Sequence, residues 1–243
     1  MYIHQTWESA STLTNDMRQS IREWKRMHPH LKHKFWDSKA REEFMRTEYP
    51  SYYQTYRKYG HGVERADMWR IAVLHKYGGV YVDTDIVPVK DITQTPLWGK
   101  PLVFGSWEDM TGSFIIAQTP GNPLLLGILE YMVRAFKNPL YKFLPRNVRI
   151  SLTTGSDAIK RNVPRTKAYY IPRQEFVPCS MCEENTPVCE VNEGRYFLHL
   201  DGKTWNGGTE RFLNRLYCFA KTYTVPILLV VITLLLVLMK IRK

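Results

Sequence analysis

The sequence predicts an α/β fold in a single domain, followed by one membrane-spanning helix. Short apolar runs rich in β-branched residues alternate with segments of helical periodicity as far as about residue 136. Eighteen uncharged residues, 222–239, then lie close to the C-terminus. The 243 residues are enough for one sizeable core. We therefore expect a domain over 1–216, a transmembrane helix over 222–239 and a basic tail over 240–243.

Each element of the domain is predicted by a local pattern. Strands are indicated where short apolar or β-branched runs occur, and helices where apolar residues recur three or four positions apart. Caps and prolines set the helix limits, as with Asp37 or Ser38 before one helix and Asn122-Pro123 before another. The expected strands are 2–5, 34–36, 80–82, 102–104 and 114–117, and the expected helices are 17–28, 38–49, 63–77 and 122–136.

The strongest functional signal is an Asp-x-Asp triplet at the end of a buried strand. Gly78-Gly79 stops the preceding helix, because glycine accepts the left-handed conformation, and the run 80–82 then leads to Asp83 and Asp85. Residues 86–89 are expected to continue the strand. Side chains at i and i+2 of an extended segment point to one side, so the two carboxylates converge. Hard oxygen ligands suit Mg²⁺ or Mn²⁺, which commonly also hold substrate phosphates.

An isolated Asp-x-Asp is also compatible with a solvated surface turn. Here the acids interrupt a core strand, and buried carboxylates are costly unless a positive charge lies on them. The context therefore favours a cation site over a solvated turn.

Basic residues gather in one stretch of the chain. The formal net charge is +11, and residues 134–173 hold ten lysines and arginines against the single acid Asp157. Aromatic residues are interspersed among them. The stretch predicts either a solvated face or a surface that meets lipid headgroups or a nucleotide. No nucleic-acid-binding signature accompanies it, so nucleic acid is not an expected partner.

The C-terminal apolar segment favours lipid as the anionic partner. Residues 222–239 are long enough to span a bilayer when nearly upright, and a buried core helix is the alternative. Tyr217 and Tyr223 lie near one end and basic residues 240–243 at the other. Residues 1–7 lack the features of a secretory signal. The basic tail favours a luminal domain, whereas tail-anchored insertion would reverse the orientation, and both stay open.

The cysteines leave three interpretations open. They are Cys179, Cys182, Cys189 and Cys218. The first three have the spacing C-x2-C-x6-C, and Cys218 could complete a zinc site, although the spacing matches no known zinc module. A disulfide in a luminal loop is favoured, and free thiols are the third possibility.

Three blocks of sequence resemble a known family. They are Ile3-His4-Gln5-Thr6-Trp7, Arg65-Ala66-Asp67-x-x-Arg70, and the run from Tyr77 to Asp85. Together they resemble the Asp-x-Asp sugar-binding region of glycosyltransferase family 32, which includes yeast-type α-mannosyltransferases and inositol phosphorylceramide mannosyltransferase catalytic subunits. The resemblance is dense over 61–89 and thin but collinear to about residue 206. It implies a GT-A nucleotide-sugar-binding fold with a Rossmann-like central sheet.

The resemblance also implies roles for individual residues. Asp83, Asp85, Asp67 and Arg70 would be the catalytic group: Asp85 would bind the metal, Asp83 would assist it and contact the ribose, and Asp67 with Arg70 would hold the donor sugar from one helix face. His199 would be the third metal ligand, with Asp201 as an alternative. Thr154-Gly155-Ser156 resembles the family's Thr-Gly-Pro turn. Further donor-binding residues would be Arg65, Tyr81, Ser113 and Trp205.

The expected function is metal-dependent hexose transfer with retention of configuration. Mn²⁺ or Mg²⁺ is the expected cofactor, and no residue stands out as a covalent nucleophile. GDP-mannose is the favoured donor, and inositol phosphorylceramide is a suitable membrane acceptor because its phosphate would suit the basic stretch. A glycoprotein glycan is the rival acceptor. The non-enzymatic alternative is an inactive membrane-anchored module that binds sugar nucleotides. The expected location is the Golgi or ER membrane.

Overall fold

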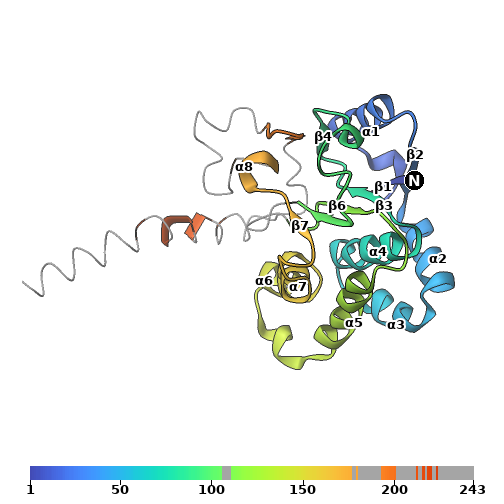
Figure 1. Cartoon of the computed structure of the whole chain (residues 1–243). Coiled ribbons are helices and arrows are strands. Elements are labelled where there is room, and N and C mark those ends of the chain that lie inside the picture. The colour runs from blue at the N-terminus through green and yellow to red at the C-terminus, as the bar shows by residue number, and fades with distance from the viewer. Residues whose placement is uncertain are drawn as a thin grey trace, which may run out of the picture. The chain divides into compact units, whose positions relative to one another are not determined.

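A computed structural model describes residues 1–105, 111–176, 179 and 193–200, and then 212, 215, 216, 218–220 and 223. The chain divides into two compact units, one made of Met1–Pro178 with Val191–Gly202 and the other of Cys179–Glu190 with Lys203–Lys243. The helices and strands described below belong to the first unit (Figure 1).

The first unit is built on a six-stranded mixed sheet in the order β2-β1-β3-β6-β5-β7. The strands are β1 (Tyr2–Thr6), β2 (Lys32–Trp36), β3 (Gly79–Val82), β5 (Leu102–Phe104), β6 (Phe114–Ala117) and β7 (Tyr169–Tyr170). β2, β1 and β3 are parallel, β6 is antiparallel to both β3 and β5, and β7 is parallel to β5. A separate antiparallel pair joins β4 (Ile86–Pro88) to β8 (Phe197–His199).

Helices cover both faces of the central sheet. They are α1 (Asn15–Met27), α2 (Ser38–Glu48), α3 (Pro50–Lys58), α4 (Gly62–Tyr77), α5 (Pro123–Lys137), α6 (Arg146–Thr153), α7 (Ser156–Asn162) and α8 (Arg173–Phe176), with 3-10 turns η1 (Ala10–Thr12), η2 (Ile92–Gln94) and η3 (Pro139–Phe143). Helices α2 to α5 pack on one face, whereas α1 and β4 lie on the other (Figure 1).

Strand side chains alternate between two hydrophobic cores. In β3, Val80 and Val82 belong to the core on the α1 side, and Tyr81 belongs to the core beneath α4. β6 repeats this alternation with Phe114 and Ile115. A strand buried on both faces has no polar alternation, which explains the continuous apolar runs in the sequence.

The structure confirms the strands and helices expected up to residue 137, with one exception. The segment 86–89 does not continue β3, because the chain turns after Val82 and β4 pairs with β8 in a different sheet. Residues 86–89 are apolar and follow β3 almost directly, so their sequence did not indicate that they pair with β8 in a different sheet. Helix α3 and the elements after α5 were not expected from the sequence.

A buried histidine holds the glycine turn that precedes β3. His4 accepts a hydrogen bond at Nδ1 from the indole of Trp36 (3.3 Å), so its proton lies on Nε2 and is donated to the carbonyl of Gly78 (3.1 Å). Burial lowers the pKa of His4 to about 4. The neutral ring therefore fixes the end of α4 against β1 and aims β3 towards the functional site.

A second histidine on the neighbouring strand gives a testable pH dependence. Burial, with the charge of Lys25 as a smaller cause, lowers the pKa of His33 to about 4, below its ordinary value of about 6.5. Between these values the unfolded chain takes up a proton that the folded chain does not, so this histidine lowers stability as the pH falls. We expect His33→Gln to gain stability relative to the wild type between pH 6.5 and 4, measured as the difference in melting temperature. A difference that stays constant over this range would contradict the expectation.

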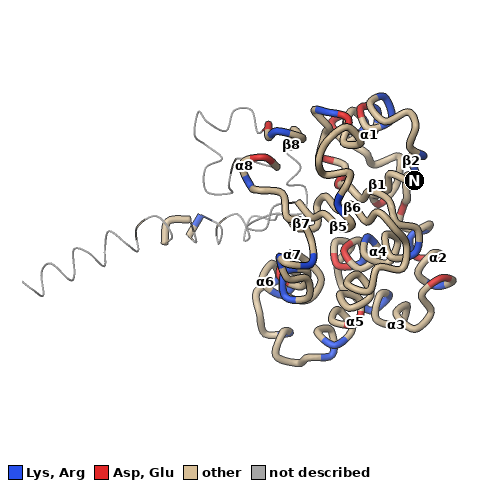
Figure 2. Tube along the Cα trace, in the orientation of Figure 1, with Lys and Arg blue, Asp and Glu red and all other residues tan. Residues whose placement is uncertain are grey.

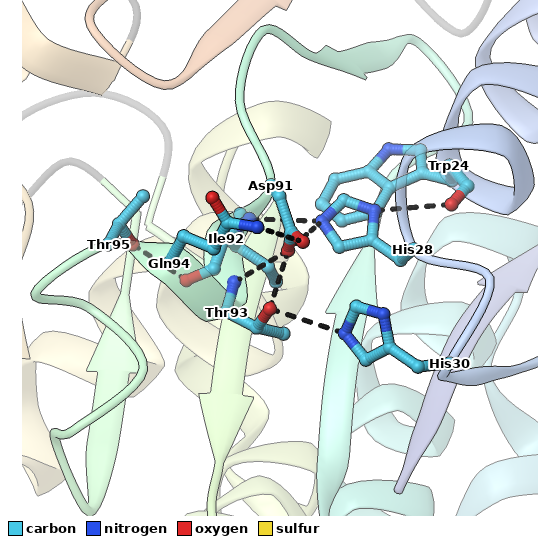
Figure 3. A network of polar contacts seen from close by, with 8 residues as sticks. All are labelled: Trp24, His28, His30, Asp91, Ile92, Thr93, Gln94 and Thr95. Carbon is cyan, nitrogen blue, oxygen red and sulfur yellow. Dashed lines mark hydrogen bonds and ion pairs between the residues drawn. The ribbon is translucent and has the colours of Figure 1, made fainter.

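His28 ties α1 to the segment that follows β4 (Figure 3). It donates from Nδ1 to the carbonyl of Trp24 (3.2 Å) and accepts at Nε2 from the N–H of Ile92 (3.0 Å). Trp24 donates its indole N–H to the carbonyl of Ile86 (2.8 Å), and burial lowers the pKa of His28. These contacts position the chain immediately after the Asp-x-Asp triplet.

The C-terminal predictions fall mostly outside the described residues. Within the described residues, no helix has the length and apolarity needed to cross a bilayer. The expected span 222–239 lies outside them except for Tyr223, and so do Cys182 and Cys189. Cys179 and Cys218 are both disulfide-bonded, which contradicts zinc binding or free thiols for these two residues.

Candidate donor-sugar and metal site

The Asp-x-Asp triplet forms a turn at the carboxyl end of β3. The N–H of Asp83 donates to the carbonyl of Ser113, the residue before β6 (2.8 Å), and the N–H of Ile86 donates to the carbonyl of Asp83 (3.2 Å). Thr84 is buried between the two acids. The expectation of an extended Asp83–Asp85 segment was therefore wrong, because the chain bends to carry β4 into the second sheet.

The two carboxylates lie in a partly enclosed site. Their side chains retain exposed fractions of 32% for Asp83 and 22% for Asp85. Burial raises the pKa of both groups; the charge of Asp85 raises that of Asp83 further, whereas the guanidinium of Arg70 opposes the shift in both. The Oδ1 atom of Asp85 is buried and accepts no hydrogen bond. Such an oxygen is costly unless a donor or a cation satisfies it, and a divalent cation fits this carboxylate pair.

Strand pairing brings His199 to this pair. β8 places His199 opposite Ile86, and its Nε2 lies 3.9 Å from Oδ2 of Asp85. The N–H of Leu200 donates to the carbonyl of Asp85 (2.8 Å), which fixes the two segments together. In the part of the chain that the structure describes, no group of three His, Cys, Asp or Glu is arranged to hold one ion. Two carboxylates completed by substrate phosphates and water are a common way of binding Mg²⁺.

Arg70 connects the helix acid to the triplet. On α4 it forms an ion pair with Asp67, donates from Nη1 to the carbonyl of Gly112 (2.7 Å), and lies 3.6 Å from Oδ1 of Asp83. Its guanidinium stacks over the ring of Tyr81, 5.0 Å from the centroid. One planar cation thus bridges α4, the loop before β6 and the end of β3.

Asp67 is buried and has both oxygens engaged. Oδ1 pairs with Arg70, and Oδ2 accepts a hydrogen bond from the hydroxyl of Thr154 (2.8 Å). Thr154 follows α6 and is itself buried. The sequence did not mark Thr154 as a site residue; its only signal was the Thr-Gly turn.

Tyr81 contacts the Asp-x-Asp triplet, whereas Arg65 contacts the backbone after α3. Tyr81 is buried, and its hydroxyl donates to Oδ1 of Asp83, so the ring orients this carboxylate. Arg65 donates to the carbonyl of Tyr59 (2.7 Å), the residue that follows α3, so it makes a structural contact. Trp205 and Asp201 lie outside the described residues. The structure thus brings together Asp67, Arg70, Tyr81, Asp83, Asp85, Ser113 and His199.

The bridging role of Arg70 predicts a strong effect of a charge-conserving substitution. Lysine carries the charge but cannot reach Asp67, Gly112 and Asp83 together, because it lacks the planar fork of five N–H groups. We expect Arg70→Lys to lower kcat/KM for donor turnover by about 10- to 100-fold, corresponding to about 1.4 to 2.7 kcal/mol. Arg57→Lys on the exposed surface of α3 is the control. Equal activity of both variants would contradict the bridge.

One family model matches the part of the chain that contains the Asp-x-Asp triplet. Residues 14–102 match the family described as glycosyltransferase sugar-binding region containing DXD motif. In Saccharomyces cerevisiae, mannosyl phosphorylinositol ceramide synthase SUR1 is 36% identical over 59% of this chain and 36% of its own length. Mannosyl phosphorylinositol ceramide synthase CSH1 is 33% identical over 88% of this chain and 54% of its own length.

A solved structure was also compared with this fold. A glycosyltransferase involved in glycosylation of the major capsid of PBCV-1 aligns over 89% of this chain and 97% of that chain, with a TM-score of 0.48 and 8% identity.

The acidic site and these sequence matches are those of a glycosyltransferase sugar-binding region. Residues 14–102 form a DXD-containing sugar-binding region of the glycosyltransferase type, which confirms the resemblance to family 32. It spans about half the length, or less, of the curated relatives named here.

Proposed function

We propose that the protein is a metal-dependent, retaining hexosyltransferase of GT-A type that moves mannose from GDP-mannose to a membrane-associated acceptor such as inositol phosphorylceramide. The observation that carries the proposal is the buried, unsatisfied Oδ1 of Asp85 beside a second carboxylate. The names of the relatives favour mannose and an inositol-containing sphingolipid. A C-terminal anchor over 222–239 in the Golgi or ER membrane belongs to the same proposal.

The chemistry requires expulsion of a nucleoside diphosphate. Asp83 and Asp85, with His199 beside them, would hold Mn²⁺ or Mg²⁺, which when bound supplies a Lewis acid for the charge on the leaving group. Asp85 offers a buried oxygen without a competing hydrogen bond, and Tyr81 orients Asp83 by donating to its Oδ1. The residues are thus arranged before the ligand arrives.

The Asp67–Arg70 pair would orient the donor sugar. A carboxylate accepts hydrogen bonds from sugar hydroxyls, and a guanidinium donates to them. Thr154 donates to Asp67 at 2.8 Å and the carbonyl of Gly112 accepts from Arg70 at 2.7 Å, so each member of the pair is held by a further contact. A fixed pair lowers the entropic cost of aligning the sugar with its acceptor.

A donor screen of the purified full-length chain tests the proposal. Mn²⁺ is added, and hydrolysis is measured for GDP-mannose, UDP-glucose, UDP-galactose and UDP-N-acetylglucosamine. We expect GDP-mannose to be cleaved, EDTA to abolish the reaction, and Mn²⁺ or Mg²⁺ to restore it. Cleavage of a UDP-sugar alone would identify a donor other than GDP-mannose. Metal-dependent binding without cleavage would favour an inactive module, and absence of any metal-dependent binding would overturn the proposal.

A comparison of acceptors separates the two transfer hypotheses. With the donor identified, inositol phosphorylceramide and a mannose-containing glycopeptide are offered in parallel. Transfer to the lipid supports the proposal, whereas transfer to the glycopeptide alone supports a glycan-directed enzyme.

A further inference from the structure

The connection between α5 and α6 exposes large apolar side chains. Phe143 on η3 is 85% exposed and Leu140 is 69% exposed, and Val148 on α6 is also exposed. Among the described residues of the first unit, the other exposed large hydrophobic side chains are Met1 and Tyr77, at 42% and 37%. Leu140 and Phe143 are three positions apart on one short turn, so their exposed side chains form one candidate contact surface.

This turn, residues 137–149, is held in a defined conformation. Asn138 caps η3 by accepting the N–H of Leu140 at 3.0 Å, and Pro139 occupies its first turn. Pro145 is the N-cap of α6. The prolines restrict the backbone, so little ordering is required when the turn meets a partner.

The turn carries positive charge and no acid. Lys137 ends α5, Lys142 lies on η3 between Leu140 and Phe143, and Arg146 and Arg149 belong to α6. Both lysines are exposed. Figure 2 shows basic residues on this connection. Arg149 is half-buried and lies 4.0 Å from Glu64, so the exposed charges are those of the two lysines. Exposed apolar side chains accompanied by lysines suit the boundary between anionic headgroups and acyl chains.

We propose that the turn 137–149 docks into the anionic headgroup layer of a membrane, with Leu140 and Phe143 inserted below the phosphates. This docking stands on observations separate from the carboxylate site. Each lysine near an anionic surface contributes about 1 kcal/mol, equivalent to roughly a fivefold preference.

Helix α6 then sets the height of the catalytic site above the membrane. The helix begins at Arg146, within the turn, and ends at Thr153, and the next residue, Thr154, donates a hydrogen bond to Asp67. Eight helical residues rise about 12 Å. This step rests on the proposed lipid acceptor, because a docked turn would keep the sugar-binding acid within reach of a glycolipid headgroup.

The test uses the 243-residue chain in lipid vesicles. The proposed anchor 222–239 would bind lipid in every variant, so the measurement reports only the environment of the turn. An environment-sensitive fluorescent amino acid replaces Phe143, and in a matched protein it replaces Tyr53 on α3. Vesicles are phosphatidylcholine with or without phosphatidylinositol. We expect a blue shift and quenching by shallow spin-labelled lipid at position 143 only, greater in anionic vesicles and reduced by high salt.

A charge-reversal pair supplies the control. In the protein labelled at 143, Lys137→Glu with Lys142→Glu should abolish the blue shift, whereas Arg57→Glu with Lys58→Glu on α3 should leave it unchanged. Circular dichroism verifies that both variants are folded. The same emission in vesicles as in detergent-free buffer would overturn the docking, as would a shift insensitive to lipid charge.

Donor hydrolysis is measured on the same samples. Hydrolysis without insertion refutes the docking alone, whereas insertion without metal-dependent donor binding refutes the proposed function alone.

Discussion

Asp85→Asn is expected to abolish donor turnover while leaving the protein folded. The substitution removes a negative ligand from the cation site but keeps its volume, and the carbonyl of residue 85 still accepts the N–H of Leu200. We expect kcat/KM to fall at least about 100-fold, the scale seen when one stabilising group at a reacting centre is lost. Steady-state hydrolysis of the donor with saturating Mn²⁺ measures the change.

The stability of the same variant provides the second half of this prediction. Burial disfavours the charged form of Asp85 and raises its pKa, so neutral asparagine removes a buried charge. The melting temperature without added metal should therefore be unchanged or higher at pH 7. Asp16→Asn, on the exposed first turn of α1, is the control and should change neither quantity. Full activity of Asp85→Asn would contradict the proposal that Asp85 binds the metal ion.

Gly79→Ala is expected to disrupt the sheet itself. Gly79 has a φ of +99°, and a Cβ placed there would lie 2.4 Å from the carbonyl oxygen of Tyr2. The left-handed conformation alone costs about 1–3 kcal/mol for a side-chain residue, and the contact is with backbone of the adjacent strand. We expect a loss of at least about 3 kcal/mol in the free energy of unfolding, measured by denaturant titration.

Gly127 supplies a matched control for this substitution. It lies inside α5, and a Cβ there would meet nothing within 4 Å. Gly127→Ala should gain about 0.5–1 kcal/mol, since glycine is the poorer helix former. If both variants lost similar stability, the close approach of β3 to β1 would not explain the glycine at position 79.

The elements that the sequence predicted are those whose signals are local. Helix α4 carries its own periodicity and ends at a glycine with positive φ, and α5 begins at an asparagine cap followed by proline. The strands of the central sheet are buried on both faces, so their continuous apolar runs identify them without knowledge of partners. Helix α3 was missed because Tyr49-Pro50 was taken only as the end of the helix before it.

The sequence predicted which acidic and basic residues form the site, but not the hydrogen bonds that hold them. Asp67, Arg70, Asp83 and Asp85 were named from two short blocks, and the structure brings them together. The hydrogen bond from Thr154 to Asp67 joins residues 87 positions apart, and no local pattern encodes such a contact. Arg65 donates to the backbone carbonyl of Tyr59, a partner that a sequence block cannot reveal.

The separation of β4 and β8 from the central sheet has a consequence for how the enzyme could release its product. The pair contains six residues and closes a loop of more than a hundred, with Ile86 opposite His199. A two-stranded ribbon is only marginally stable by itself, so this pair depends on the burial of Ile86 and Phe197 in the core on the α1 side. Local opening still needs less free energy than global unfolding, and opening of the pair while β3 and β6 remain paired would expose Asp85 further. Amide protons of β8 should then exchange with deuterium well before those of β3. The same opening would provide a route for release of the nucleoside diphosphate product.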